Sequence, residues 1–173
     1  MTTTTHLLRT RRFLPLFVTQ LLGAFNDNLF KNAMVLFVVF NVYNSEQAEA
    51  RFSGLATALF IVPFVALSAI SGQLADMRDK ARIIRLVKTC EIGIMTVGAA
   101  GLLLAWKVIE VHALAIPLML IALFSMGIHS TFFGPIKYAI LPQHLHAEEV
   151  LAGTGLVEAG TYLAILAGTI VAG

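Results

Sequence analysis

Long apolar runs separated by short polar connectors make up most of the chain. A helix needs about 20 apolar residues to cross the hydrocarbon core of a bilayer, and five segments reach that length. The alternating pattern typical of a membrane barrel is absent from the sequence. We therefore predict an all-α integral membrane protein with a transmembrane domain at 13–173. Its expected helices are 13–42, 53–75, 83–106, 112–133 and 148–173.

The overall composition agrees with a membrane protein. Hydrophobic residues make up 58% of the chain and charged residues 13%, and the mean hydropathy is +0.83. These values are too apolar for an ordinary soluble domain. The net charge of +2 is small and the basic residues cluster in short connectors, so we expect no nucleic-acid partner. Cys90 is the only cysteine, which excludes an internal disulfide and a metal site made of cysteines alone.

The lysines and arginines fall mainly into alternate connectors, and this distribution predicts how the chain is oriented. On one side they are Arg9, Arg11, Arg12, Arg78, Lys80, Arg82, Arg85 and Lys137. The opposite side carries Arg51 and Lys107 alone. Cytoplasmic loops of membrane proteins hold an excess of basic residues. We therefore expect the N-terminal tail 1–12 and the connectors after the second and fourth helices to be cytoplasmic.

The first apolar segment is interrupted by the stretch GAFNDNLFKNA, at 23–33. Its polar residues are Asn26, Asp27, Asn28, Lys31 and Asn32. At 100° per residue, all of them except Asn26 fall within an arc of about 140° on one helix face. Asp27 lies about 21 Å along the helix from Phe13, near the middle of a bilayer. An Asp and a Lys at that depth together cost about 5–7 kcal/mol on insertion, so this face must look into protein or water.

Two interpretations of Asp27 and Lys31 remain open. At positions i and i+4, the two side chains could neutralise each other as a structural pair. Alternatively they line a substrate or ion pathway, which is the usual role of ionisable residues within a membrane. Five polar groups exceed what one neutral pair requires, and this favours the pathway. Both interpretations can hold in different conformations of a transporter.

A second informative stretch is GQLADMRDKARII, at 72–84 in the connector after the second helix. It resembles the signature that the major facilitator superfamily carries between its second and third helices, although Met77 and Asp79 depart from the usual Arg and Gly. The resemblance implies that Gly72 allows close helix approach, that Asp76 sits at a helix end and that basic residues anchor the cytoplasmic face. Those basic residues are Arg78, Lys80 and Arg82.

Three further pieces together resemble the bacterial lysophospholipid transporter branch of that superfamily. They are AFNDN at 24–28, GPIKYAIL at 134–141 and GLVEAGTYLAILAGTIVAG at 155–173. The likeness covers essentially the whole chain. FNDNLFKNA resembles in particular the version in which the transporter precedes an acyltransferase and an acyl-carrier-protein (ACP) ligase in one polypeptide. Such transporters have twelve helices, so the resemblance implies that this chain holds the first five of a longer, truncated bundle.

The resemblance also implies which residues meet the substrate. Asp27 matches the acidic position of the first helix, Lys137 the lysine of the connector after the fourth helix, and Glu158 the acidic residue of the fifth helix. Lys31 is not shared across the wider branch. We expect the substrate pathway to include Asp27, Asn28, Lys31, Lys137 and Glu158.

The residues themselves leave the roles of Lys137 and Glu158 open. Glu158 lies about 15 Å into its helix, where hydroxyl groups on the same face could satisfy its carboxyl. Those hydroxyls belong to Thr154, Thr161 and Tyr162. Lys137 follows Gly134 and Pro135, which we expect to break the fourth helix. The lysine could contact a phosphate or merely set the orientation of the chain.

Other features have structural explanations. Lys88 and Glu91, at i and i+3, are expected to pair near the inner end of the third helix, and His129 to be a hydrogen-bonded interior histidine. Small residues every four positions in the fifth helix should let another helix approach closely. They are Gly160, Ala164, Gly168 and Ala172. Before them, a group of His and Glu side chains fits no familiar ligand spacing, so we expect a solvated helix start and no metal. That group is His144, His146, Glu148 and Glu149.

The chain is interpreted as part of a transporter rather than an enzyme. Glycerolipid acyltransferases carry a His, four residues and an Asp, and no His here is so placed. A Gly-rich phosphate loop and a nucleophile elbow are absent as well. The resemblance implies movement of lysophosphatidylethanolamine or a related lipid toward the cytoplasmic leaflet for re-acylation. On that basis we predict a lysophospholipid transporter of the bacterial inner membrane that needs no cofactor. A superfamily transporter of a soluble metabolite and the membrane segment of a fused acyltransferase remain alternatives, and any catalytic domain would lie beyond residue 173.

Overall fold

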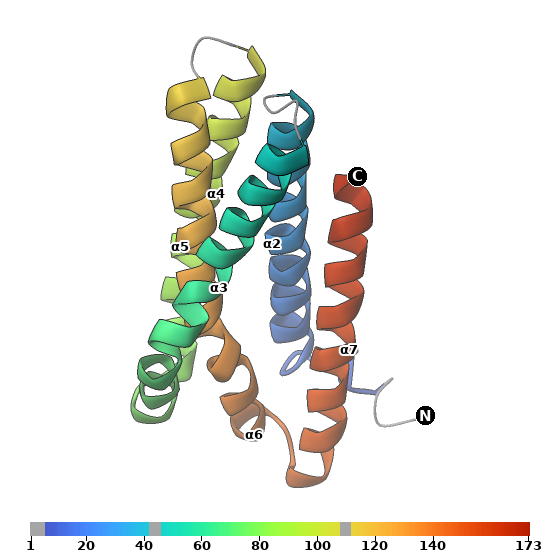
Figure 1. Cartoon of the computed structure of the whole chain (residues 1–173). Helices are drawn as coiled ribbons and strands as arrows, with labels where there is room; N and C mark the ends of the chain where they lie inside the picture. The colour runs from blue at the N-terminus through green and yellow to red at the C-terminus, as the bar shows by residue number, and fades with distance from the viewer. Residues whose placement is uncertain (1–5, 42–45, 108–111) are drawn as a thin grey trace.

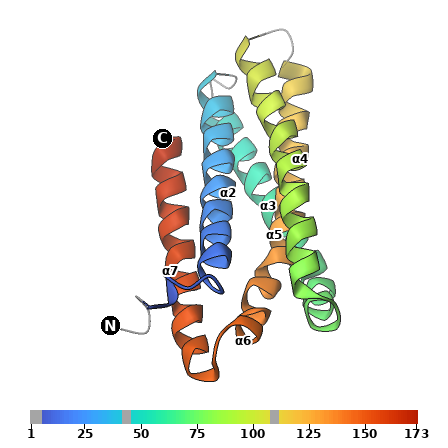
Figure 2. The ribbon, with the colours of Figure 1, turned by 180° about the vertical axis from the view of Figure 1, so that it is seen from behind.

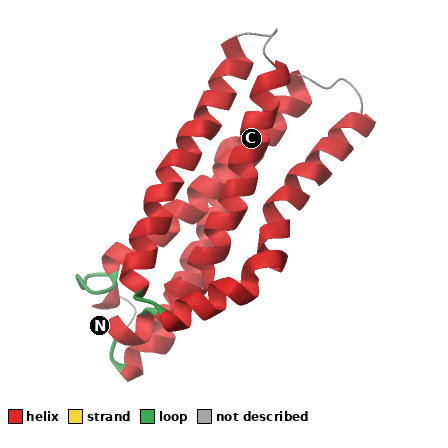
Figure 3. Ribbon diagram, turned by 90° about the vertical axis from the view of Figure 1, so that its left-hand side faces the viewer, coloured by secondary structure: helices red, strands yellow, loops and turns green. Residues whose placement is uncertain are grey.

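The computed structural model describes residues 6–41, 46–107 and 112–173, and these residues form helices joined by short loops (Figures 1 and 3). No strand occurs in the described ranges. The helices are α2 (Leu14–Asn41), α3 (Glu46–Met77), α4 (Lys80–Lys107), α5 (His112–Ala139), α6 (Leu141–His144) and α7 (Ala147–Ala172). The five long helices run up and down along one another, and α6 is a single turn between α5 and α7 (Figure 1). The predicted all-α class is confirmed.

Four of the long helices are long and apolar enough to cross a membrane. They are Glu46–Met77, Lys80–Trp106, Ala113–Ala139 and Ala147–Ala172. Helix α2 is not among them although it has 28 residues, because the polar stretch around Asp27 lowers its hydropathy. Its position in a membrane therefore stays a prediction. Val42, the expected last residue of this helix, lies outside the described residues.

Helix α5 does not end where the sequence suggested. The pair Gly134 and Pro135 was expected to break it, yet the helix continues through both residues to Ala139. A proline inside a helix removes one backbone donor, but the next turn still forms, and Ile140 donates its N–H to the carbonyl of Ile136 at 3.1 Å. The expected break is wrong, and Lys137 therefore projects from the last turn of α5 instead of from a connector.

The bundle is built from two sets of neighbours. Helix α5 packs against both α3 and α4, whereas α2 packs mainly along α7 (Figures 1 and 2). The largest buried cluster joins α3, α4 and α5 to the C-terminal half of α2. It includes Phe30, Met34, Phe52, Met119, Leu123 and Met126. A second cluster joins the N-terminal segment to α6 and α7, and includes Leu7, Phe13, Leu141, Leu145 and Val157.

The small residues of α7 allow its close approach to α2, as the sequence predicted. Gly160, Ala164 and Gly168 are buried, and Ala172 is half-buried. A β-carbon at Gly160 would lie 2.8 Å from Cε2 of Phe17, and one at Gly168 would lie 2.6 Å from the backbone oxygen of Phe25. Because real β-carbons do not approach other atoms so closely, a side chain at Gly168 would push the two helices apart. Packing of small residues is a main source of helix association in membranes.

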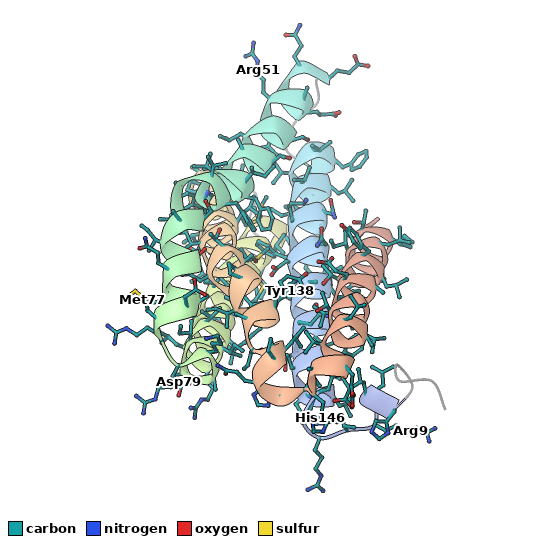
Figure 4. All side chains as sticks on the ribbon, turned by 90° about the horizontal axis from the view of Figure 1, so that it is seen from below. Arg9, Arg51, Met77, Asp79, Tyr138 and His146 are labelled. Atoms are coloured by element: carbon teal, nitrogen blue, oxygen red, sulfur yellow. The ribbon has the colours of Figure 1, made fainter. Side chains whose placement is uncertain are left out.

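The predicted basic connectors lie at one end of the bundle. The N-terminal segment, the turn between α3 and α4, and α6 all lie at the bottom of Figure 1. Figure 4 looks onto this end, where Arg9, Asp79 and His146 are labelled. Arg12 donates to Oε1 of Glu149 at 2.7 Å, and Oε2 of Glu149 accepts the His146 N–H at 3.0 Å. These bonds fasten the N-terminal segment to the start of α7.

Candidate functional site: a charged cavity between helices

A cavity of about 320 Å³ lies between the helices and is lined by residues of α2, α3, α5 and α7 and by Lys88 of α4. Three phenylalanines, Phe60, Phe64 and Phe133, form much of its apolar wall. Its charged and polar lining comes from four helices and includes Asp27, Asn28, Lys88, His129, Lys137 and Thr161. A small set of converging polar groups in an otherwise apolar cavity is typical of a ligand site.

Asp27 is the buried acid of this cavity, with 8% of its surface exposed. One carboxylate oxygen, Oδ2, accepts a hydrogen bond from the Ser130 hydroxyl on α5 at 2.6 Å. The other oxygen, Oδ1, is buried and has no hydrogen-bond partner. Buried polar atoms are nearly always paired, so Oδ1 is an acceptor available to a ligand.

Lys31 does not neutralise Asp27 in this structure. No ion pair joins these two side chains, both of which belong to the described part of α2. Instead, the Lys31 ammonium lies 5.5 Å from the ring centroid of Phe60. Lys31 is not among the residues that line the cavity. The interpretation of Asp27 and Lys31 as a simple structural pair is therefore wrong for this conformation.

Lys137 is the basic residue that reaches the cavity from the last turn of α5. Its Nζ donates to Oγ1 of Thr161 on α7 at 3.2 Å and lies 5.0 Å from the Tyr138 ring centroid. Thr161 is itself held close to Gln20 of α2, with 2.8 Å between Oγ1 and Oε1. Among the described residues, the Thr161 hydroxyl is the only hydrogen-bond acceptor of this ammonium, and no carboxylate forms an ion pair with it.

Glu158 takes a partner that the sequence did not indicate. Its Oε1 accepts a hydrogen bond from the hydroxyl of Tyr138 on α5, which Figure 4 labels near the middle of the bundle. Two of the hydroxyls expected to satisfy it bond to their own helix instead: Thr154 donates to the carbonyl of Val150 at 2.9 Å, and Oγ1 of Thr161 lies 2.8 Å from the carbonyl oxygen of Val157. Glu158 does not line the cavity. The structure thus brings Asp27, Asn28 and Lys137 together at the cavity, and places Lys31 and Glu158 beside it.

A cluster from α4 and α5 also borders the cavity. Lys88 pairs with Glu91, as expected, with 2.7 Å between Nζ and Oε2. Nε2 of His129 lies 3.3 Å from the same Oε2. The Lys88 ammonium also lies 4.5 Å from the Phe133 ring centroid. The sequence assigned these residues no place in the pathway, although three ionisable side chains in apolar helices were a signal for one.

The loop signature lies at the end of the bundle, away from the cavity. Asp76 is exposed in the last turn of α3, and Arg78 and Arg82 are exposed beside it. Asp79 accepts the backbone N–H of Arg82 at 2.9 Å and so caps the start of α4, which begins at Lys80. A β-carbon at Gly72 would meet nothing within 4 Å, so no described helix approaches this glycine closely, and the expected close approach stays a prediction.

The cavity and the apolar helices around it define the class of the molecule. Four described helices that could each cross a membrane indicate a multi-pass membrane protein, and ionisable side chains inside such helices are typical of transport pathways. No family model and no solved structure matches the chain. Curated relatives, however, do match it.

Several matching relatives carry the name Lysophospholipid transporter LplT. The one from Photorhabdus laumondii is 25% identical over 166 residues, which is 96% of this chain and 37% of the relative. Those from Salmonella newport and Salmonella heidelberg are each 26% identical over 160 residues, which is 92% of this chain and 35% of the relative. The chain therefore spans about 35–37% of the length of these relatives. The resemblance to the lysophospholipid transporter branch is confirmed.

Proposed function

We propose that this chain forms part of a transporter that moves lysophospholipid across the inner membrane of a bacterium. The observation that carries the proposal is the cavity itself, which is lined both by Asp27 of α2, with one carboxylate oxygen free, and by Lys137 of α5. A zwitterionic head group offers one charge to each of them. Similarity to proteins named lysophospholipid transporters along more than nine tenths of the chain supports the same substrate.

The proposed mechanism divides the lipid between polar and apolar surfaces. Oδ1 of Asp27 accepts hydrogen bonds from the ammonium of the head group, and Lys137 donates to its phosphate, both as charge-assisted hydrogen bonds. Asn28 lines the same cavity and offers a further polar contact. The acyl chain stays on apolar helix faces. Rocking of helix bundles around the site exposes the head group to each side of the membrane in turn.

Two neighbours of the cavity have supporting roles in this proposal. Glu158 holds the hydroxyl of Tyr138, the residue next to Lys137, and so helps to set the last turn of α5. Lys31 is close enough to Phe60 to stabilise that wall of the cavity. Delivery toward the cytoplasmic leaflet would serve re-acylation, and a fused or associated acyltransferase or acyl-ACP ligase remains a prediction about the partner.

Transport assays with two related substrates test the proposal. Proteoliposomes that hold the protein as its cell expresses it receive labelled lysophosphatidylethanolamine or labelled glycerophosphoethanolamine, which has the same head group and no acyl chain. We expect saturable movement of the lysolipid, at least tenfold faster than that of the soluble compound. Equal or faster movement of glycerophosphoethanolamine would instead identify a transporter of soluble metabolites.

A matched comparison tests the site. Lys137→Met should raise the half-saturating concentration of lysophosphatidylethanolamine, because a charge-assisted bond to phosphate contributes about 1.5–3 kcal/mol, or about 10- to 150-fold. It should have little effect on a neutral monoacylglycerol, which has no phosphate. A similar loss for both lipids would contradict the assignment of Lys137 to the phosphate.

A further inference from the structure

The buried side-chain atoms that lack a hydrogen-bond partner gather at the charged cavity. Among the described residues, these atoms are Oδ1 of Asp27, Nε2 of Gln20, and both ring nitrogens of His129. All three residues line the cavity. Buried polar atoms in proteins are nearly always paired. A concentration of unpaired atoms at one place therefore indicates a ligand with several polar groups.

His129 is the member of this group that has no role in the transport mechanism described so far, apart from Gln20, whose Oε1 already faces Thr161. It lies on α5 with 6% of its surface exposed, and its ring stacks on Phe133 with 6.3 Å between the ring centroids. Its Nε2 lies 3.3 Å from Oε2 of Glu91 but makes no hydrogen bond to it. Because Nε2 faces this carboxylate, Nδ1 is the nitrogen left for a ligand.

The charged groups around His129 are already compensated without it. On α4, the Lys88 ammonium lies 2.7 Å from Glu91. On α2 and α5, Asp27 and Lys137 take the two charges of the head group in the proposed mechanism. Helix α3 contributes Phe60 and Phe64 to the cavity and no charged side chain.

A hydroxyl group is the partner that suits this imidazole. An imidazole nitrogen accepts a hydrogen bond when the ring is neutral and donates one when the ring is protonated. A hydroxyl both donates and accepts, so it fits the ring in either state. The one hydroxyl of lysophosphatidylethanolamine is on its glycerol, at the position from which an acyl chain is missing.

The positions along α5 agree with such a contact. Ser130, next to His129, donates to Asp27, so His129 and Asp27 lie at a similar depth. Lys137 lies further along α5 by about 12 Å, and helix side chains lean toward the N-terminus of their helix, which brings its ammonium back toward His129. From a phosphate at Lys137, the ethanolamine arm would reach Asp27 and the glycerol arm would reach His129.

We propose that His129 binds the free glycerol hydroxyl of the lysophospholipid and so distinguishes it from a phospholipid with two acyl chains. In the latter this oxygen is esterified and has no proton to donate, and its acyl chain would need the space beside the imidazole. The cavity of about 320 Å³ has the volume of about ten water molecules, which leaves little room for that chain. This inference rests on the proposed transport of lysophospholipid and adds the group by which the substrate is selected.

A deoxy analogue of lysophosphatidylethanolamine tests this contact, because a hydrogen replaces the glycerol hydroxyl while the charges and the acyl chain stay the same. Each lipid competes with labelled lysophosphatidylethanolamine for the protein as its cell expresses it, held in lipid nanodiscs. We expect the unmodified protein to bind the analogue about 5- to 150-fold more weakly, because the analogue leaves a buried nitrogen without a partner.

Two variants place the effect at His129. His129→Phe keeps a ring against Phe133 and removes both nitrogens, and Lys88 still neutralises Glu91. It should bind the lysolipid and the deoxy analogue with affinities within about twofold of each other, since no hydrogen bond to the hydroxyl remains. His129→Asn keeps a polar group near the position of Nδ1 and should retain a preference of at least about threefold for the lysolipid.

A matched control makes the same chemical change outside the cavity. His144 is exposed on α6 and does not line the cavity. His144→Phe should therefore leave the preference for the lysolipid within about twofold of that of the unmodified protein.

The outcomes separate this inference from the proposed function. Failure of the unmodified protein to bind lysophosphatidylethanolamine would overturn the proposed function and this inference together. Equal binding of the lysolipid and its deoxy analogue would overturn the inference alone. A similar loss of both lipids in His129→Phe, with the preference unchanged, would mean that the histidine acts on the phosphate or on the fold and not on the hydroxyl. Loss of the preference in His144→Phe would mean that it does not arise at the cavity.

Discussion

At the scale of single residues, the unusual feature is a carboxylate that is buried but only half satisfied. Ser130 holds one oxygen of Asp27, and the other has no hydrogen-bond partner. A structural acid in an apolar helix would be expected to use both oxygens, since each unpaired buried group costs about 1–3 kcal/mol. Leaving one oxygen free is costly unless a ligand completes the site. This cost is the physical argument for a role in binding.

The first prediction concerns Asp27→Asn. This change keeps the shape of the side chain and removes a charge from the apolar region, so we expect near-normal abundance but at least a tenfold loss of lysolipid uptake. Adding Lys31→Leu separates the two interpretations, because a purely structural pair would be rescued by removing both charges. We expect no rescue, since Lys31 contacts the face of Phe60 and not Asp27. Normal uptake by the double variant would show that the cavity works without this carboxylate.

The second prediction concerns the cluster of Lys88, Glu91 and His129. Glu91→Gln removes the charge that both basic groups face and leaves an ammonium unpaired in the interior, which should destabilise the protein by about 1–3 kcal/mol. Lys88→Met in the same chain should restore much of that loss, because no unpaired charge remains. Unfolding in detergent, followed for the two single variants and the double variant, measures the coupling. Strictly additive effects would show that the pair contributes nothing to stability.

At the scale of helices, the contact between α2 and α7 is set by residues without side chains. The backbone oxygen of Phe25 occupies the space that a β-carbon of Gly168 would need. Gly155 belongs to the same helix, but a β-carbon there would meet nothing within 4 Å. An added side chain would therefore clash with α2 at Gly168 but would find open space at Gly155.

The third prediction uses this pair of positions. Gly168→Leu should destabilise the protein by about 1–3 kcal/mol, because the added side chain forces α7 away from α2. Gly155→Leu is the control, and it should be neutral or slightly stabilising, since leucine favours a helix by up to about 1 kcal/mol over glycine. Thermal unfolding in a single detergent measures both variants. Equal destabilisation would mean that the close approach of the helices is not what Gly168 provides.

The sequence predicted the helices and part of the cavity for a clear physical reason. In lipid, a long apolar run can pair its backbone N–H and C=O groups only by forming a helix. Asp27 stood out because a charge is costly in such a helix. The partners of the buried groups could not be predicted, since they lie on other helices. Ser130 reaches Asp27 from α5, and Tyr138 reaches Glu158 across to α7. The rotation of each helix about its axis decides such contacts, and a single sequence does not reveal it.

At the scale of the whole molecule, the basic residues gather at the end that holds the N-terminal segment, the turn before α4 and α6. Arg9, Arg78 and Arg82 are all exposed there. The retention of such charges on the cytoplasmic side orients membrane proteins. If this end is cytoplasmic, Lys137 lies near the inner opening of the proposed pathway. A phosphate that enters from the outer leaflet would then meet Asp27, which lies deeper in the membrane, before it reaches Lys137.

The last prediction tests that orientation by labelling with a thiol reagent that does not cross membranes. Cys90 is exposed, so it is first replaced by serine, and single cysteines are then introduced as Lys80→Cys at the start of α4 and Glu46→Cys at the start of α3. In intact cells the reagent should label position 46 and leave position 80 unlabelled until the membrane is opened. Labelling of both positions after permeabilisation provides the control for reactivity. The opposite pattern in intact cells would place the basic end outside, against the positive-inside bias, and would move Lys137 to the outer opening of the pathway.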